Sequence, residues 1–168
     1  MKAIRMGAYS SLAYEEVSRI AQVWADAGFD AAPVIDIAAM QWEKLICNVA
    51  YSAPCAITGL TVGDVLDHPH MSIVSRAAAR EAFDVAIASG MKLQFTDPDK
   101  EIRDFAARMP NAKPSVLLDL EAGRISEVDV INGAIPRQGA KVGLKAPVNA
   151  TLTELVKTLE LKGRPQSP

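Results

Sequence analysis

The chain has 168 residues, 49% of them hydrophobic, and a formal net charge of −2 at pH 7. This composition excludes an intrinsically disordered chain, and the length allows a buried core without disulfides or metals. The weak negative charge and the lack of a Lys/Arg run exclude an electrostatic surface for nucleic acid. No apolar segment of a secretory signal follows Lys2 and Arg5, and no apolar run approaches the ~20 residues that span a bilayer. We therefore expect a cytoplasmic protein without a membrane partner.

The first part of the chain, residues 1–36, predicts a β-α-β unit. We expect strands over residues 3–7 and 30–35, and between them a helix over residues 14–27, where apolar residues recur at helical spacing. Gly28 is expected to end that helix. Because parallel sheets are normally covered on both faces, this short unit is interpreted as the tail of a larger, truncated nucleotide-binding α/β domain.

The rest of the chain predicts a helical domain over residues 37–162, followed by a frayed tail at residues 163–168. Helices are expected over residues 37–56, 72–89, 98–109, 115–122 and 128–142, and a last helix, preceded by Pro147 and Asn149, is expected to run to residue 161. Pro98 suits the first turn of its helix, Ser115 is expected to cap the next one, and Pro136 is expected to bend or interrupt its helix. The predicted fold class is therefore mainly α, with a short β-α-β remnant.

Lys44, Asn48 and Ser52 are spaced by four residues and should form one polar stripe along a helix. Apolar residues border this stripe, so Lys44 lies where a lysine can serve as a proton donor. The alternative is that Lys44 extends into solvent and Asn48 faces water, and the spacing alone favours this alternative.

A second group of polar residues, Ser126, Glu127 and Asp129, precedes an apolar helical pattern. Carboxylates and a capping serine are favoured at a helix start, which explains these residues without any function. A functional role requires Glu127 to point into a cleft, and spacing does not decide between the two interpretations.

The cysteines and histidines offer weaker candidates for chemistry. Cys47 and Cys55 lie in an apolar helical stretch, which predicts two buried thiols rather than a disulfide. His68 and His70 flank a proline in a predicted surface turn, and no further ligands with suitable spacing accompany them, so we expect no metal site. Neither the G-x-G-x-x-G nor the P-loop pattern occurs, and no hydrolase nucleophile elbow is present.

Five motifs, in this order and at these separations, resemble the C-terminal half of ketopantoate reductases (2-dehydropantoate 2-reductases). The motifs are Trp42-x-Lys44-Leu45-x-x-Asn48, Thr58-Gly59-x-Thr61-Val62-Gly63-Asp64, Ser115-Val116-x-x-Asp119, Gly123-Arg124-x-Ser126-Glu127-x-Asp129-x-Ile131-Asn132-Gly133 and Pro147-x-Asn149-x-x-Leu152-x-x-Leu155-Val156-Lys157. The resemblance covers nearly the whole chain. It implies a helical domain similar to that of 6-phosphogluconate dehydrogenase, preceded by the end of a Rossmann-type domain.

The resemblance also implies a function. It implies the C-terminal part of an NADPH-dependent reductase that converts 2-dehydropantoate, or a related small 2-oxo acid, to the 2-hydroxy acid in pantothenate biosynthesis. Lys44 would be the general acid that protonates the carbonyl oxygen as hydride reaches the adjacent carbon. Glu127 would hold the substrate or orient Lys44. Asn48, Ser52 and Ser115 would bind the substrate, with Ser115 at its carboxylate.

Three departures from the family pattern leave alternatives open. The family often has an asparagine where this chain has Ser52, and some members have one in place of Val62, so a related 2-oxo acid is an alternative substrate. The glycine-rich phosphate turn is absent, so we do not expect strong NADPH binding or turnover by this chain alone. The competing hypothesis is a standalone, non-catalytic ligand-binding or dimerisation module, in which exposed apolar surface would favour a homodimer.

Overall fold

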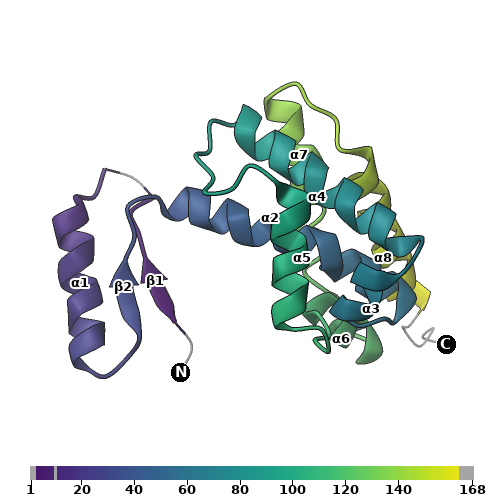
Figure 1. The fold of residues 1–168 in the computed structure, drawn as a ribbon, viewed down its shortest axis with the longest axis horizontal. Coiled ribbons are helices and arrows are strands. Elements are labelled where there is room, and N and C mark those ends of the chain that lie inside the picture. Colours follow the sequence, from purple (N-terminus) through teal and green to yellow (C-terminus); the bar gives the residue numbers. More distant parts are fainter. Residues whose placement is uncertain (1–2, 10, 163–168) are drawn as a thin grey trace. The chain divides into compact units, whose positions relative to one another are not determined.

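A computed structural model describes residues 3–9 and 11–162 of the protein (Figure 1). Within these residues it contains two strands, β1 (Ile4–Met6) and β2 (Ala31–Pro33), and eight helices. The helices are α1 (Tyr14–Asp26), α2 (Ile37–Thr58), α3 (Val62–Asp67), α4 (Met71–Ala88), α5 (Pro98–Arg108), α6 (Ser115–Glu121), α7 (Ala134–Lys141) and α8 (Pro147–Lys162). The predicted mainly helical class with a short β-α-β unit is confirmed. The tail expected at residues 163–168 lies outside the described residues.

The chain divides into two compact units, residues 1–43 and residues 44–168, with the division inside α2. The boundary expected after residue 36 lies at the start of α2. In the first unit, β1 and β2 pair in parallel. Helix α1 buries Val17 and Ala21, and Gly28 follows it with a φ of +89°, a conformation that favours glycine. The predicted end of this helix is therefore confirmed.

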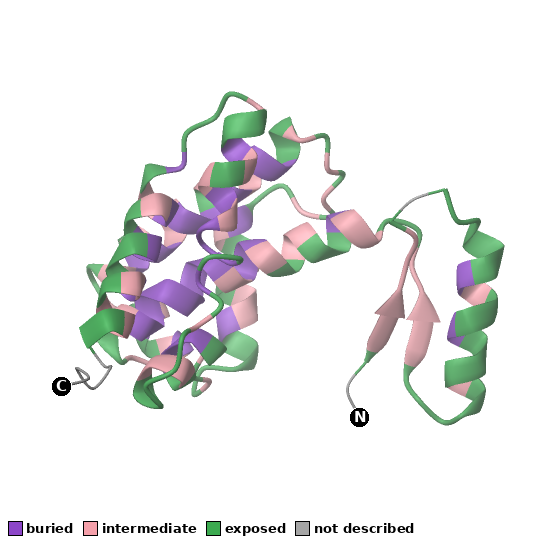
Figure 2. Cartoon of the chain, turned by 180° about the vertical axis from the view of Figure 1, so that it is seen from behind, coloured by how far each residue is buried: buried purple, intermediate pink, exposed green. Residues whose placement is uncertain are grey.

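The second unit is built around the C-terminal half of α2, which is buried over most of its length (Figure 2). This part of α2 can be buried because most of its residues are apolar and none after Lys44 is charged. Helix α4 presents small buried side chains, among them Ser75, Ala78, Ala79 and Ala82, which let neighbouring helices pack closely.

The helix predicted over residues 115–122 forms as α6, but Ser115 does not cap it. Pro114 occupies the N-cap position with an extended backbone, and no side-chain capping hydrogen bond is present there. Ser115 is the first helical residue, where its hydroxyl does not have the geometry of an N-cap. By contrast, the start predicted at Pro98 is confirmed, since the Asp97 side chain accepts hydrogen bonds from the amides of Asp99 and Lys100.

The helix predicted over residues 128–142 is wrong in its first half. Residues 128–133 form turns, and α7 begins only at Ala134. Consequently Glu127 does not begin a helix. Pro136 is the third residue of α7, where a backbone N–H has no partner within the helix, so it neither bends nor interrupts α7.

Helix α3 was not predicted, although its start carries a clear signal. Thr61 is the N-cap, and its hydroxyl accepts from the Asp64 amide, while the Asp64 carboxylate accepts from the Thr61 amide. This reciprocal capping box holds the pKa of Asp64 below its ordinary value, because the Thr61 hydroxyl and amide both donate to the carboxylate. Val62 and Val65 of this short helix are buried.

Candidate active site

One cavity in the second unit, with a volume of about 410 Å³, is lined by all five residues that the sequence predicted for the site. Lys44, Asn48 and Ser52 reach it from α2, because a spacing of four residues places side chains on one helix face. Ser115 comes from the start of α6, and Glu127 comes from the turns before α7. Segments that are far apart in the sequence therefore meet at one cavity.

The side chains of these five residues do not interact with other polar groups of the described residues. None of them forms a side-chain hydrogen bond or ion pair with another residue in the described part of the chain. Ser52 is buried, Asn48 is half-buried, and Lys44, Ser115 and Glu127 are exposed. Lys44 is thus exposed, as the alternative interpretation expected, yet it lines the cavity. Polar groups that line a cavity without internal partners are available to a ligand.

The rest of the cavity lining is mainly apolar and aromatic, and it includes Tyr51, Val62, Phe105, Met109 and Ile131. The Tyr51 hydroxyl donates to the carbonyl oxygen of Ile102 at 2.8 Å, and its ring stacks on Phe105 with centroids 6.0 Å apart. Burial raises the pKa of Tyr51 well above its ordinary value, so the phenol stays neutral. This lining suits the hydrocarbon part of a ligand.

The sequence did not single out Lys113, which also lines the cavity. Its ammonium group donates to Glu121 at 2.6 Å, an ion pair between partly exposed side chains. With Lys44 and Lys113 against Glu127, cations outnumber anions in the lining, which favours an anionic ligand. The only sequence signal for Lys113 was its place in the proline-flanked segment before Ser115.

The predicted state of the two cysteines is confirmed. Cys47 and Cys55 are both buried and form no disulfide. Burial raises the pKa of the Cys55 thiol to about 12, with a smaller contribution from Asp64. Cys47 also lines the cavity. Cys55 therefore stays protonated inside the core.

The described residues outside this cavity contain no second group of polar side chains that suggests an active site. His68 Nδ1 accepts from the amides of His70 and Met71 and so stabilises the turn before α4. Within residues 3–9 and 11–162, no three His, Cys, Asp or Glu residues cluster as metal ligands would. No helix in that part combines the length and hydropathy needed to cross a bilayer. A second hollow of about 390 Å³ is lined by residues of α2, α4 and α8 and contains no charged side chain.

Comparison with known proteins identifies relatives over most of the chain. Residues 36–160 match the family described as "Ketopantoate reductase PanE/ApbA C terminal". The 2-dehydropantoate 2-reductase of Archaeoglobus fulgidus is 37% identical, over 86% of this chain and 48% of the relative. The same enzyme from Pyrobaculum aerophilum is 31% identical, over 86% of this chain and 51% of the relative. The chain thus spans about half the length of these relatives.

Solved structures agree with this family. The PanE/ApbA family ketopantoate reductase of Ralstonia eutropha superposes with a TM-score of 0.84 at 33% identity. The match covers 96% of this chain and 53% of that structure's chain.

Proposed function

The chain belongs to the ketopantoate reductase family, and we propose that it forms the substrate-binding and proton-donating part of an NADPH-dependent 2-oxo acid reductase. The observation that carries this proposal is the single cavity lined by Lys44, Asn48, Ser52, Ser115 and Glu127. The proposed reductant of the complete enzyme is NADPH, which supplies a hydride. The 168 residues contain no glycine-rich phosphate turn, so the roles proposed here concern only the substrate and the proton.

The proposed chemistry centres on the carbonyl oxygen of the substrate. As a hydride reaches the carbonyl carbon, negative charge develops on this oxygen, and Lys44 donates a proton to it. Asn48 donates a hydrogen bond to the bound substrate and Ser115 holds its carboxylate, with Lys113 adding positive charge nearby. Glu127 orients Lys44 or the substrate. Lys113 is paired with Glu121, whereas the other side chains have no competing partner among the described residues and are available for these roles.

The lining also supports a class of substrate. A 2-oxo acid with a branched hydrocarbon side chain would place its carboxylate and carbonyl among the charged residues and its branches against Val62, Phe105 and Ile131. The Tyr51 hydroxyl already donates a hydrogen bond to the Ile102 carbonyl oxygen. We therefore propose that the hydroxyl of the buried Ser52 binds a hydroxyl of the substrate. 2-Dehydropantoate, which carries such a hydroxyl, is the first substrate to test.

Catalysis is tested by joining the chain to the nucleotide-binding domain of the Archaeoglobus relative. We expect this fusion to reduce 2-dehydropantoate with NADPH, and Lys44→Met to lower kcat by about 10²- to 10⁴-fold. Lys92→Met, a change of an exposed lysine outside the cavity, should leave kcat unchanged. A Lys44→Met fusion with normal kcat would exclude Lys44 as the acid. Rapid NADPH oxidation by the 168-residue chain alone would contradict the proposal that this chain supplies only the substrate site and the proton donor.

A second candidate function is a non-catalytic ligand-binding or dimerisation module. It is favoured by apolar side chains that are exposed in the first unit, including Ile20, Val23 and Trp24 of α1 and Ile35. Light scattering at high protein concentration tests the homodimer, and a monomer there counts against dimerisation.

A further inference from the structure

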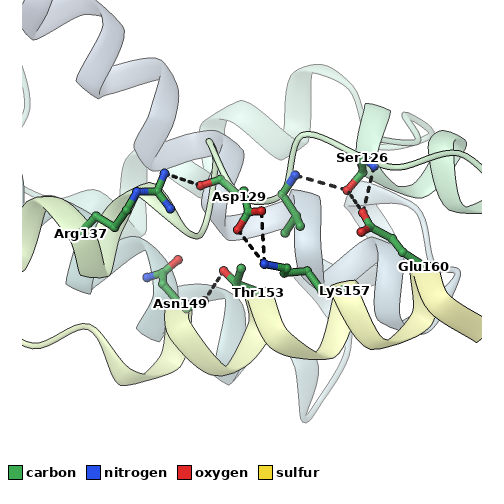
Figure 3. Close-up of polar contacts among 8 residues, drawn as sticks. Ser126, Asp129, Arg137, Asn149, Thr153, Lys157 and Glu160 are labelled. Carbon is green, nitrogen blue, oxygen red and sulfur yellow. Dashed lines mark hydrogen bonds and ion pairs between the residues drawn. The ribbon is translucent and has the colours of Figure 1, made fainter.

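Residues 126–133, the turn segment before α7, are tied to α8 on both sides of Glu127 (Figure 3). On one side, Glu160 accepts hydrogen bonds from the Ser126 amide at 2.9 Å and from the Ser126 hydroxyl at 2.7 Å. On the other side, the Lys157 ammonium lies 3.3 Å from the Asp129 carboxylate. Both contacts come from the last two turns of α8. The backbone of Glu127 is therefore bracketed by two polar contacts to one helix.

The segment itself transmits this restraint to Glu127. Its carbonyl oxygen accepts from the amides of Val130 at 3.0 Å and Ile131 at 3.1 Å. The Ser126 hydroxyl accepts from the Val128 amide at 3.2 Å. The Glu127 side chain has no partner among the described residues, so the position of its backbone determines which part of the cavity the side chain can reach.

We propose that Glu160 and Lys157 are positioning residues that hold Glu127 at the cavity. Glu160 is the stronger of the two, because it is half-buried and its charged oxygen accepts two hydrogen bonds from adjacent groups. The Lys157–Asp129 pair is weaker, since its side chains are 41% and 57% exposed and screened by solvent. The restraint on the segment stands on geometry alone, and only its effect on substrate binding rests on the proposed function.

The test uses the full 168-residue chain and three variants of α8. Glu160→Ala removes both hydrogen bonds to Ser126, whereas Glu160→Gln keeps an oxygen that can accept them. Glu154→Ala is the matched control, because that exposed side chain has no partner in the described part of the chain. The first readout is hydrogen exchange of the Ile131 amide, and the second is the Kd for 2-dehydropantoate measured by calorimetry.

In Glu160→Ala we expect exchange at Ile131 to quicken about tenfold, while amides in α4 keep their wild-type rates. We also expect the Kd to rise by at least about fivefold, with Glu160→Gln within about twofold of wild type and Glu154→Ala unchanged. If Glu160→Ala does not fold, Lys157→Met should show the same local effects with smaller size.

Several outcomes separate the two proposals. The positioning role would be overturned if the Ile131 amide exchanged at its wild-type rate in Glu160→Ala. If Glu160→Ala does not fold, the same result in Lys157→Met would overturn it. Faster local exchange with an unchanged Kd would overturn the link between α8 and the site. A wild-type chain that binds no 2-dehydropantoate would count against the proposed function, while the exchange data would still decide whether α8 holds the segment.

Discussion

At the scale of single residues, Ser52 and Ser75 are two buried serines of the second unit with different surroundings. The Ser75 hydroxyl hydrogen-bonds the hydroxyl of Tyr51, whereas Ser52 lines the cavity without a side-chain partner in the described residues. We predict that Ser75→Ala costs about 1 kcal/mol of unfolding free energy, and that Ser52→Ala changes it by less than about 0.5 kcal/mol. Urea denaturation measures both. Ser52→Ala should nevertheless weaken binding of 2-dehydropantoate, and a large loss of stability would mean that its hydroxyl has a structural role.

The buried Cys55 thiol gives a second prediction at this scale. Its raised pKa of about 12 and its complete burial keep the thiolate scarce and shielded. Since the thiolate is the reactive form, we predict that iodoacetamide near pH 8 modifies Cys55 only after unfolding. Mass spectrometry of native and urea-treated protein checks this. Rapid modification of the native protein would contradict the burial of this side chain.

At the scale of elements, the capping box of α3 links stability to pH. The lowered pKa of Asp64 means that the folded state binds this proton less readily than the unfolded state does. The Asp64 carboxylate therefore contributes to the free energy of unfolding above the ordinary aspartate pKa of about 3.9, and this contribution is lost as the pH falls through the lowered pKa. We predict that Asp64→Ala is less stable than wild type at neutral pH and that this difference shrinks as the pH falls below about 3.9. A difference that does not depend on pH would contradict the role of the carboxylate.

The N-terminal turn of α8 is fixed by a buried amide network. Asn149 accepts from Asn132 at 2.9 Å and donates to the Ala78 carbonyl oxygen and to the Glu81 carboxylate. Asn132 also donates to the carbonyl oxygen of Val49 on α2, so the network joins α2, α4, α8 and the turn segment. We predict that Asn149→Leu costs about 2–4 kcal/mol, because it leaves several buried polar groups unpaired.

Thr151→Ala, an exposed change on the same helix, provides the control for this network and should stay within about 0.5 kcal/mol of wild type. Both free energies come from urea unfolding. Equal stabilities of the two variants would show that the network does not hold α8.

Most helices were predictable because their ends carry local signals. Asp97 before Pro98 and Gly28 after α1 act through neighbouring backbone groups, which a sequence shows directly. The turns at residues 128–133 were not predictable from periodicity, because apolar residues there are buried by tertiary packing. Gly133 is part of that packing, since a Cβ there would lie 2.7 Å from the carbonyl oxygen of Asp129. The capping signal of α3 was present in the sequence but was not recognised.

At the scale of the whole molecule, helical spacing and family motifs predicted Lys44, Asn48 and Ser52 as one group. The apolar lining was not predicted, because a sequence does not reveal which face of α5 will lie beside α2. Phe105 and Met109 therefore became visible as lining residues only in the folded structure. The roles of the five polar residues remain predictions.

The measurement that tests the central claim most directly is an NMR titration of the ¹⁵N-labelled 168-residue chain with 2-dehydropantoate. We predict saturable chemical-shift changes at residues 44–52, 113–115 and 127–131, including the side-chain amide of Asn48, and weaker binding in Asn48→Ala. The absence of saturable changes, or changes centred on the apolar hollow near Ile57 and Leu155, would contradict the assignment of this cavity as the substrate site.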